Sequence, residues 1–448
     1  MRGAFLFFFK IQLPITSYQL LITNSRRQCA IILSNMKIKS IRNVANIKGR
    51  RVLLRVDFNM TIGKDLKVDK NEDYRIVQTL PTIKFLIKKG AKVIIMAHLG
   101  RPDGKVVEDL RLDPVAVRLS QLLGKCVYKS DDIIETHGNA SLQKQINQLK
   151  NGEVMMLENI RFNPGEDPPT LEASARQSLP SLKLWRGKEK LAKELAKLGD
   201  IFVNDGFAVS HRDQASVSTI QNYLPSYAGL LLGQEIDNLS KVIKNPKKPL
   251  VVIIGGAKIS TKIKVIKNFL PVAEKVLLGG ALANTVLKAM GISVGKSFIE
   301  PEMFKEVEKI RLTDNKLVVP VDGVMAKNYQ AKKDRIDAIA DVRYNEVILD
   351  IGPDTVKLYE KILKRAKMVV WNGPMGLIET PAFAKGTEAL IKILAKSHAE
   401  TIVGGGETVQ IIRRLGLQKK FNFISTGGGA MLEFLEGKKL PGLRKIIN

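Results

Sequence analysis

Short apolar runs alternate with amphipathic segments along the chain from residue 50 onward. Most of the apolar runs are continuous, which is typical of parallel strands that are covered on both faces. Amphipathic helical patterns separate them, for example over residues 74–90 and 188–199. This alternation predicts an α/β fold with doubly wound parallel sheets. The candidate strands are residues 51–58, 92–99, 154–160, 200–207, 249–256, 275–280, 316–322, 368–373, 401–406 and 421–426.

The segment from residue 222 to residue 250 divides this pattern into two halves of similar size. It has prolines near both ends and a helical middle from Gln234 to Lys244. A chain of 448 residues is also too long for one ordinary hydrophobic core. We therefore predict two doubly wound, Rossmann-like domains joined by a hinge helix. The predicted units are an N-terminal domain at 36–225, the hinge at 226–248, a C-terminal domain at 249–430, and a segment at 431–448 that packs back on the N-terminal domain.

Two further segments do not follow the strand and helix pattern. The apolar run at 5–9 is similar to a signal peptide, but Lys10 interrupts it, no small-residue cleavage site follows cleanly, and it is too short to span a bilayer. We expect residues 1–35 to be a translated upstream segment or a loose extension before Met36, with a secretion signal as the alternative. Residues 166–187 contain three prolines and show little strand or helix pattern, which is typical of a functional or mobile surface loop.

The charge balance allows several kinds of partner. Lys and Arg total 72 against 44 Asp and Glu, for a net charge of +28. Nucleic acid, an anionic membrane or a small polyanionic substrate would each suit such a charge. The lysines are spread along the chain, which favours a solvated surface for most of them. The only cysteines are Cys29 and Cys126, and the histidines show no metal-ligand spacing, so a disulfide framework and a Cys-based zinc site are excluded and a reducing cytosol fits.

Glycine clusters follow several predicted strands of the second half. They are Gly255-Gly256, Gly279-Gly280, Gly404 to Gly406, and Gly427 to Gly429. Backbone amides at the end of a strand, just before a helix, suit an anion. Glu407 comes directly after one cluster and would repel that anion unless a cation lay between them, so we expect a phosphate with its metal. Neither GxxxxGK[ST] nor a GxGxxG after a strand occurs, which excludes a P-loop and weakens a dinucleotide role.

Basic side chains complete two candidate anion sites. Lys258 and Lys262 lie four positions apart at the predicted start of a helix, where both could reach phosphates on one face. In the first half, basic residues occur where strands and helices meet, namely Arg75, His98, Arg101, Arg161 and Arg212. Guanidinium groups bind carboxylate and phosphate oxygens in pairs. Each residue alone would more often be a surface or core residue, but together they indicate a pocket for a small polyanion.

A series of motifs across residues 36–448 resembles the phosphoglycerate kinase family. In order, they are "RVDFN", "AHLGRPDG", "ENIRF", "GDIFVNDGFAVSHR", "GGAKISTK", "WNGPMG", "GGGET" and "ISTGGGAMLEFLEGK". That family reversibly transfers a phosphoryl group between ATP and the carboxylate of 3-phosphoglycerate in glycolysis. The resemblance implies that the N-terminal domain holds the glycerate and that the C-terminal domain binds the nucleotide. We expect a cytoplasmic monomer with no nucleic-acid or membrane partner.

The resemblance also assigns residues to each site. Those that line the phosphoglycerate site would be Asp57, Asn59, Arg75, His98, Arg101, Arg161 and Arg212. Asp57 and Asn59 would hold the hydroxyl and carboxylate end, while the arginines and His98 would cradle the far phosphate and orient the acceptor. The nucleotide-binding positions would be Lys258, Lys262, Gly279, Gly280, Asn372, Pro374, Glu379, Gly404, Gly405, Gly406, Glu407 and Thr408. Glycines 427–429 would lie where the transferred phosphoryl group passes.

The implied reaction needs no general base, because the acceptor carboxylate is already ionised at neutral pH. Catalysis then consists of positioning and charge stabilisation, a role that we assign to Arg75, Lys262, Gly428 and Gly429. Mg²⁺ would bridge the nucleotide phosphates, with Glu407 as its protein ligand. Since each domain holds one ligand, a hinge motion must bring the two ligands together and expel water.

Three features depart from the family pattern. Glu407 stands where the family usually has Asp, "MTI" follows "DFN" where a proline is common, and the segment at 166–187 is longer than the family requires. The first departure leaves the metal geometry open. Two other functions compete with this interpretation. A nucleic-acid-binding protein is disfavoured by 6% aromatic residues and the lack of a recognisable module. A non-catalytic protein on the same fold is disfavoured by the intact Arg75, Lys262 and glycine triplets.

Overall fold

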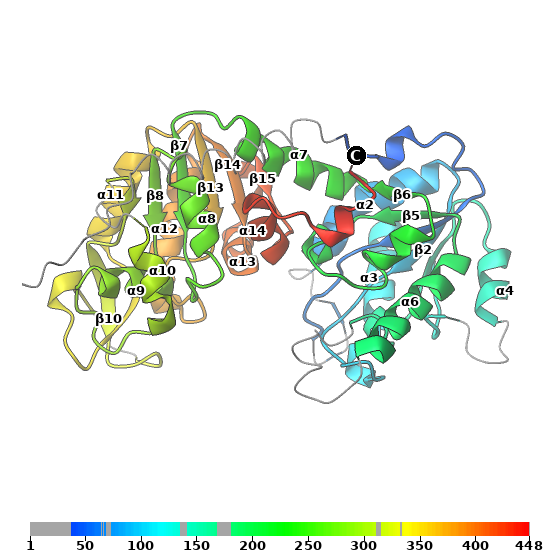
Figure 1. The fold of residues 1–448 in the computed structure, drawn as a ribbon, viewed down its shortest axis with the longest axis horizontal. Coiled ribbons are helices and arrows are strands. Elements are labelled where there is room, and N and C mark those ends of the chain that lie inside the picture. Colours follow the sequence, from blue (N-terminus) through cyan, green and yellow to red (C-terminus); the bar gives the residue numbers. More distant parts are fainter. Residues whose placement is uncertain are drawn as a thin grey trace, which may run out of the picture.

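The computed structural model describes residues 37–447 except 64, 66, 69–72, 135–140, 168–180, 311–314 and 332–333. The described chain forms two lobes, and each is built around a six-stranded parallel sheet (Figure 1). The predicted fold class is therefore confirmed. The predicted extension at 1–35 and most of the segment at 166–187 lie outside the described residues.

The sheet of the N-terminal lobe has the strand order β3-β4-β2-β1-β5-β6, with every neighbouring pair parallel. Side chains that alternate along β1 enter two different cores. Val52 and Leu54 pack with residues of α2 and α3 on one face, while Leu53 packs with residues of α4 and α6 on the other. The strands are β1 Arg51–Arg55, β2 Lys92–Met96, β3 Val127–Lys129, β4 Val154–Met156, β5 Ile201–Asn204 and β6 Ser226–Ala228, and the helices are α2 Tyr74–Lys88, α3 Asp113–Leu123, α4 Ser141–Gln148 and α6 Ser181–Lys197.

The sheet of the C-terminal lobe has the order β15-β14-β13-β7-β8-β9 and is also parallel. One face packs against α8, α9, α10 and α14, and the other packs against α11, α12 and α13. The strands are β7 Leu250–Ile254, β8 Lys275–Leu278, β9 Leu317–Val318, β13 Met368–Asn372, β14 Glu400–Gly404 and β15 Phe423–Ile424. The helices are α8 Ile263–Phe269, α9 Ala281–Ala289, α10 Phe304–Glu308, α11 Pro353–Leu363, α12 Lys385–Ala395, α13 Gly406–Arg414 and α14 Gly429–Leu435.

A small antiparallel sheet in the C-terminal lobe was not predicted. Its order is β11-β10-β12, with strands β10 Asp322–Ala326, β11 Asp334–Ala338 and β12 Val347–Ile351. The edge strand β11 has the sequence DRIDA and is largely exposed, so it has no apolar run from which it could be recognised. The strand predicted at 316–322 is in fact the two-residue β9, and its last residue begins β10.

The predicted strands are all present, but several end earlier than predicted. The first ends at Arg55 rather than residue 58, because Asp57 turns back and accepts a hydrogen bond from Asn59 N at 3.1 Å. The helix predicted at 188–199 instead begins at Ser181 and ends at Lys197. The residues between the observed and the predicted strand ends form loops, and these loops carry the candidate site.

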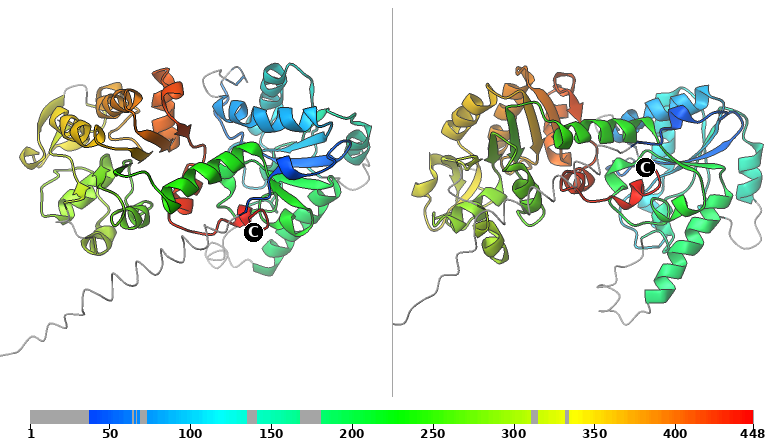
Figure 2. Two further views of the ribbon diagram at one scale, coloured as in Figure 1. Left: turned by 90° about the horizontal axis from the view of Figure 1, so that it is seen from above. Right: turned by 45° about the horizontal axis from the view of Figure 1, so that its top comes forward.

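Helix α7, Leu230–Lys244, connects the two lobes (Figures 1 and 2). The helix begins four residues before the predicted Gln234. The predicted hinge at 226–248 also needs correction, because residues 226–228 form β6 and pair with β5 of the N-terminal sheet. A strand of three residues with the sequence SYA, directly after a proline, gives too little signal to be separated from a linker.

The C-terminal segment returns to the N-terminal lobe (Figure 2). Lys39 N donates to Ile446 O at 2.8 Å, and Gly442 O accepts from Asn204 Nδ2 at 3.1 Å and from Gln221 Nε2 at 2.9 Å. Residues 431–435, which we predicted as part of this returning segment, instead complete α14 and pack in the C-terminal core. Across the described ranges, no helix is both long enough and apolar enough to cross a membrane.

Candidate active site

A cavity of about 1130 Å³ lies between the two lobes. Its walls come from the loops after β1, β14 and β15, so it lies at the carboxyl ends of both parallel sheets, where open α/β sheets bind ligands. Among the predicted site residues, the cavity brings together Asn59 and Arg75 from the N-terminal lobe with Glu379, Gly406, Glu407 and Gly428 from the C-terminal lobe. Residues assigned from sequence to two different ligands therefore face one space.

The C-terminal wall is made by glycines that turn strands into helices. Gly405 has φ +95° and precedes α13, while Gly428 has φ +51° and precedes α14. Both conformations are in the left-handed region that favours glycine. A Cβ atom on Gly406 or Gly428 would meet nothing within 4 Å, so these two glycines border open space. The unpaired amides at the start of the nine-residue α13 are thereby open to an anion in the cavity.

Lys262 lies beside these glycines rather than on a helix face. It is the residue before α8, and its Nζ donates to Gly255 O. A Cβ on Gly256 or Gly373 would lie 2.6 Å from that Nζ, so both glycines make room for the ammonium group. Burial lowers the pKa of Lys262 to about 8, and the nearby Glu407 carboxylate opposes that shift. The ammonium group is thus held with little solvent and few compensating contacts.

The predicted pairing of Lys258 with Lys262 on one helix face is wrong. Helix α8 begins only at Ile263, and Lys258 lies exposed in the preceding loop. That loop is held by Glu300, which accepts hydrogen bonds from Ile259 N and Ser260 N. The loop is therefore not helical, and four-residue spacing does not place the two lysines on one face.

The other predicted nucleotide positions occupy the ends of β8 and β13 and the start of α13. Gly256 N donates to Pro374 O at 2.8 Å, and Gly280 N donates to Met375 O at 2.7 Å, which joins three strand ends. Asn372 is buried at the end of β13, with its Nδ2 3.9 Å from Met431 Sδ. Thr408 is fully buried, and its Oγ1 has no hydrogen-bond partner among the described residues. The residues placed here but outside the cavity lining are Gly279, Gly280, Asn372, Pro374, Gly404, Gly405 and Thr408.

The N-terminal wall includes Asn59 and Arg75, and Asp57 lies directly behind it, outside the cavity lining. Arg75 Nη1 forms an ion pair with Asp57 Oδ2, and His98 Nε2 lies 3.9 Å from Asp57 Oδ1. Asn59 Oδ1 accepts a hydrogen bond from Gly100 N at 2.9 Å, which links the loop after β1 to the loop after β2. Burial lowers the pKa of Arg75 from its ordinary value. The arginine is therefore held against a carboxylate with one side open to the cavity.

Two further arginines converge behind this wall. Arg161 Nη1 donates to Gly100 O at 2.7 Å, and its Nη2 lies 3.3 Å from Asp167, which also lies 3.7 Å from Arg212 Nη1. Burial, together with the Arg212 charge, lowers the pKa of Arg161 to about 10. The buried Nε and Nη2 of Arg161 have no hydrogen-bond partner within the described ranges. Among the described residues, Nη2 therefore has only the ion pair with Asp167, and Nε has no partner. A buried guanidinium donor without a hydrogen bond is unfavourable, so the arrangement is suited to an anion that supplies one.

Some of the predicted residues are not brought together with the rest. Arg101 is exposed, and within the described part of the chain it forms no ion pair. Gly429 lies near the opposite lobe, because a Cβ added to it would be 3.8 Å from His211 Nε2. Sequence reasoning also missed Arg55 and Glu166, which are fully buried beneath the arginines. An arginine inside the apolar run "VLLRVDF" was the available signal for the first of them.

Glu407 could hold a metal ion only together with oxygen atoms supplied by a bound nucleotide. No group of three or more His, Cys, Asp and Glu side chains able to hold a metal exists among the described residues. Glu407 is exposed and lines the cavity at the start of α13. Mg²⁺ typically keeps several waters and binds through one or two carboxylates and substrate phosphates, so a single carboxylate fits a Mg²⁺ ion that arrives with a nucleotide.

Comparison with known proteins identifies the family. The family model described as phosphoglycerate kinase matches residues 41–438. The phosphoglycerate kinase of Pelotomaculum thermopropionicum is 41% identical over 418 residues, covering 92% of this chain and all of the relative. The structure of phosphoglycerate kinase from Coxiella burnetii is similar with a TM-score of 0.74 at 38% identity, covering 92% of this chain and 99% of that one.

The crystal structure of phosphoglycerate kinase from Pyrococcus horikoshii is similar with a TM-score of 0.77 at 33% identity, and covers 91% of this chain and 98% of that chain. These matches span both lobes and the cavity between them. They agree with the order of the motifs and with the two parallel sheets. The chain belongs to the phosphoglycerate kinase family.

Proposed function

We propose that this chain catalyses the reaction of its family, the reversible transfer of a phosphoryl group between ATP and the carboxylate of 3-phosphoglycerate. One observation carries the proposal. The cavity between the lobes has guanidinium and amide groups on its N-terminal wall and glycine amides on its C-terminal wall. Such a space suits two anionic ligands that must meet at one point.

The glycerate belongs on the N-terminal wall in this proposal. The guanidinium group of Arg161, whose Nε and Nη2 lack a hydrogen bond among the described residues, would bind the phosphate end of the glycerate together with Arg212. Asp57 and Asn59 would bind the hydroxyl and carboxylate end, next to Arg75 and His98. Arg101 is exposed in the described structure, so its assignment to this site depends on a movement of its loop.

The nucleotide belongs on the C-terminal wall. The amides from Gly404 to Thr408 would bind its phosphates, and Glu407 would hold the Mg²⁺ that accompanies ATP. When bound, that ion neutralises phosphate charge beside the Glu407 carboxylate. The remaining nucleotide contacts in the proposal are Lys258, Lys262, Gly279, Gly280, Asn372, Pro374 and Glu379.

The chain's own residues supply positioning and charge rather than proton transfer. The acceptor carboxylate is ionised at neutral pH, so no base has to remove a proton. Arg75 and Lys262 would stabilise the negative charge that develops on the transferred group, which passes near Gly428 and Gly429. Because the two walls belong to different lobes, a hinge motion along α7 would close the cavity and exclude water. The division into two domains joined by this hinge is part of the proposal.

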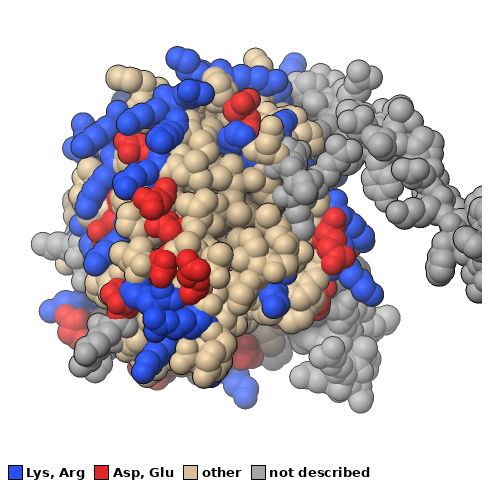
Figure 3. All heavy atoms as spheres, turned by 90° about the vertical axis from the view of Figure 1, so that its left-hand side faces the viewer, with Lys and Arg blue, Asp and Glu red and all other residues tan. Residues whose placement is uncertain are grey.

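The distribution of charged residues on the surface supports the interpretation that most of the positive charge is solvated. On the face seen in Figure 3, Lys and Arg lie among Asp and Glu around a central area of uncharged residues. We therefore propose a cytoplasmic monomer without a nucleic-acid or membrane partner. Retention of the chain on a polyanion column at physiological salt would contradict this part of the proposal.

A coupled assay with 3-phosphoglycerate and MgATP tests the function. We expect turnover that depends on both substrates and on Mg²⁺, and its loss in Arg75→Ala. Absence of turnover in folded wild-type protein would refute the proposal. Calorimetry with each substrate alone then shows whether the protein fails to bind the substrates or binds them without transferring the phosphoryl group.

A further inference from the structure

Arg55 is the last residue of β1 and is completely buried beneath the candidate glycerate site. Its Nε donates to Ser216 Oγ at 2.8 Å, and its Nη1 donates to Val56 O. Its Nη2 lies 3.7 Å from Glu166 Oε1 and 3.4 Å from His98 Nδ1. The guanidinium group therefore has a defined position and one edge that faces the histidine.

Glu166 contacts both Arg55 and Ser216 and so fixes the position of the guanidinium group. It is also fully buried, and its two oxygens accept from Ser216 N at 2.9 Å and from Ser216 Oγ at 2.6 Å. A buried carboxylate and a buried guanidinium each need an opposite charge, because either alone would be strongly unfavourable. Ser216 lies between them, accepting from Arg55 and donating to Glu166. The three residues form one connected unit, which we name the Arg55 cluster.

The contact between Arg55 and His98 determines where the histidine carries its proton. A guanidinium group has N–H donors and no acceptor. The atom that faces it, His98 Nδ1, must therefore accept, which leaves the single N–H of the neutral ring on Nε2. That Nε2 lies 3.9 Å from Asp57 Oδ1, on the side of the glycerate site.

The surroundings of His98 also disfavour a charged ring. Burial lowers the pKa of His98 well below its ordinary value, and the charges of Arg55, Arg161, Arg212 and Arg75 act in the same direction. The carboxylate that faces it, Asp57, is already paired with Arg75. A neutral ring can donate a hydrogen bond to an anion without adding a further positive charge to a group of arginines.

We infer that Arg55 is a positioning residue that holds His98 in its neutral, Nε2-protonated tautomer and directs this N–H toward the glycerate site. The tautomer follows from the contact with Arg55 and from the burial of the ring among arginines. Its consequence for 3-phosphoglycerate rests on the proposed function. Glu166 and Ser216 act through Arg55 by fixing the guanidinium group.

The tautomer can be read directly by ¹⁵N NMR of histidine-labelled protein without ligands. His98→Asn identifies the signals of this ring among the four histidines. We expect the pattern of an Nε2–H, Nδ1-unprotonated ring that does not change between about pH 5 and pH 8, the range in which an ordinary histidine titrates. An Nδ1–H ring, or a ring that becomes doubly protonated in this range, would overturn the inference.

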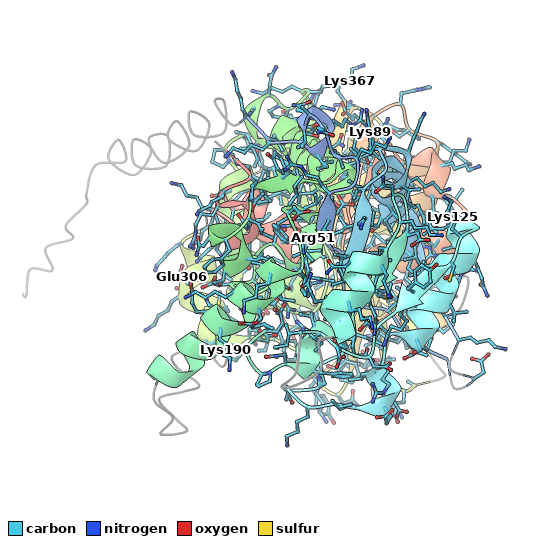
Figure 4. The ribbon with its side chains drawn as sticks, turned by 90° about the vertical axis from the view of Figure 1, so that its right-hand side faces the viewer. Arg51, Lys89, Lys125, Lys190, Glu306 and Lys367 are labelled. Atoms are coloured by element: carbon cyan, nitrogen blue, oxygen red, sulfur yellow. The ribbon has the colours of Figure 1, made fainter. Side chains whose placement is uncertain are left out.

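Arg55→Lys tests the role of the guanidinium group. A lysine keeps the positive charge that Glu166 needs, but its single ammonium group cannot reproduce the fixed fork that contacts Ser216 and His98 at the same time. We expect mixed His98 tautomers and a rise of about tenfold in the KM for 3-phosphoglycerate, with the KM for ATP little changed. Arg51→Lys is the matched control: Arg51 lies on the same strand, pairs with Asp200 at 2.6 Å and is partly exposed (labelled in Figure 4). Unchanged His98 signals in Arg55→Lys would overturn the inference.

A second variant covers the case in which Arg55→Lys does not fold. If Arg55→Lys is unstable, the double variant Arg55→Met with Glu166→Gln removes both buried charges at once, and it should show the same tautomer mixture. Loss of the tautomer preference there supports the inference, and its retention overturns it. A wild-type protein without turnover but with the expected tautomer would refute the proposed function and leave the inference about Arg55 standing.

Discussion

Replacing Lys262 with methionine should stabilise the protein while it removes most of the activity. Burial lowers the pKa of this lysine from 10.5 to about 8. At 1.36 kcal/mol per unit, keeping the charged form in the folded state costs about 3 kcal/mol at neutral pH. Losing the hydrogen bond to Gly255 O offsets about 1 kcal/mol of this. We therefore expect Lys262→Met to unfold with a free energy about 2 kcal/mol higher than the wild type at pH 7.

The pH dependence of this difference has a definite sign. Below about pH 8 the lysine is charged in both the folded and the unfolded protein, so the full cost is present. Between about pH 8 and the unfolded pKa near 10.4, the unfolded state binds more protons than the folded state, and the wild type gains stability. The advantage of Lys262→Met should therefore shrink as pH rises through this window.

Urea unfolding of both proteins at several pH values measures the difference. The exposed Lys258 supplies the control, because Lys258→Met should change the free energy of unfolding by less than about 0.5 kcal/mol. In the same preparation, kcat of Lys262→Met should fall by on the order of 10²–10³ if the ammonium group stabilises the transferred phosphoryl. A variant that is less stable than the wild type at pH 7, or a difference that does not change with pH, would refute the reasoning.

Three other variants test separate parts of the site. Arg161→Ala should raise the KM for 3-phosphoglycerate by at least about tenfold and leave ATP affinity unchanged, since the buried guanidinium group belongs to the N-terminal lobe and lacks hydrogen bonds at Nε and Nη2 among the described residues; equal losses for both substrates in calorimetry would contradict the assignment. Glu407→Gln should raise the Mg²⁺ concentration needed for half-maximal activity, while binding of metal-free ATP stays level or improves; an unchanged Mg²⁺ titration would remove Glu407 as a ligand. Glu235 lies fully buried on α7, where its carboxyl group accepts hydrogen bonds from Ser425 Oγ and Thr426 N. Glu235→Gln should gain stability relative to the wild type as pH rises from about 4.5 to about 7, because burial raises the pKa of this carboxyl to about 7 and the folded state binds the extra proton; parallel pH profiles of unfolding would contradict it.

Much of the candidate site could be predicted because its parts lie next to strand ends. Parallel strands bring their carboxyl ends to one edge, so a glycine cluster or an arginine that follows a strand is placed by topology alone. Asn59, Gly406 and Gly428 all meet at the cavity for this reason. The prediction that Lys258 and Lys262 share one helix face failed because it needed a local helix, and Glu300, a distant residue, holds that loop in another conformation.

The sequence by itself determined the two parallel sheets and the family, because strand periodicity and strand-end motifs are local properties. Only the tertiary structure decided which polar groups are buried in contact with one another. Arg55 and Ser216 are 161 positions apart, and nothing near either residue indicates that Glu166 joins them in a buried cluster beneath His98. The exposed strand β11 was hidden for a related reason, since its charged residues become a strand only by pairing with β10. Burial and pairing are properties of the folded chain, and they decide pKa, tautomer and the shape of the cavity.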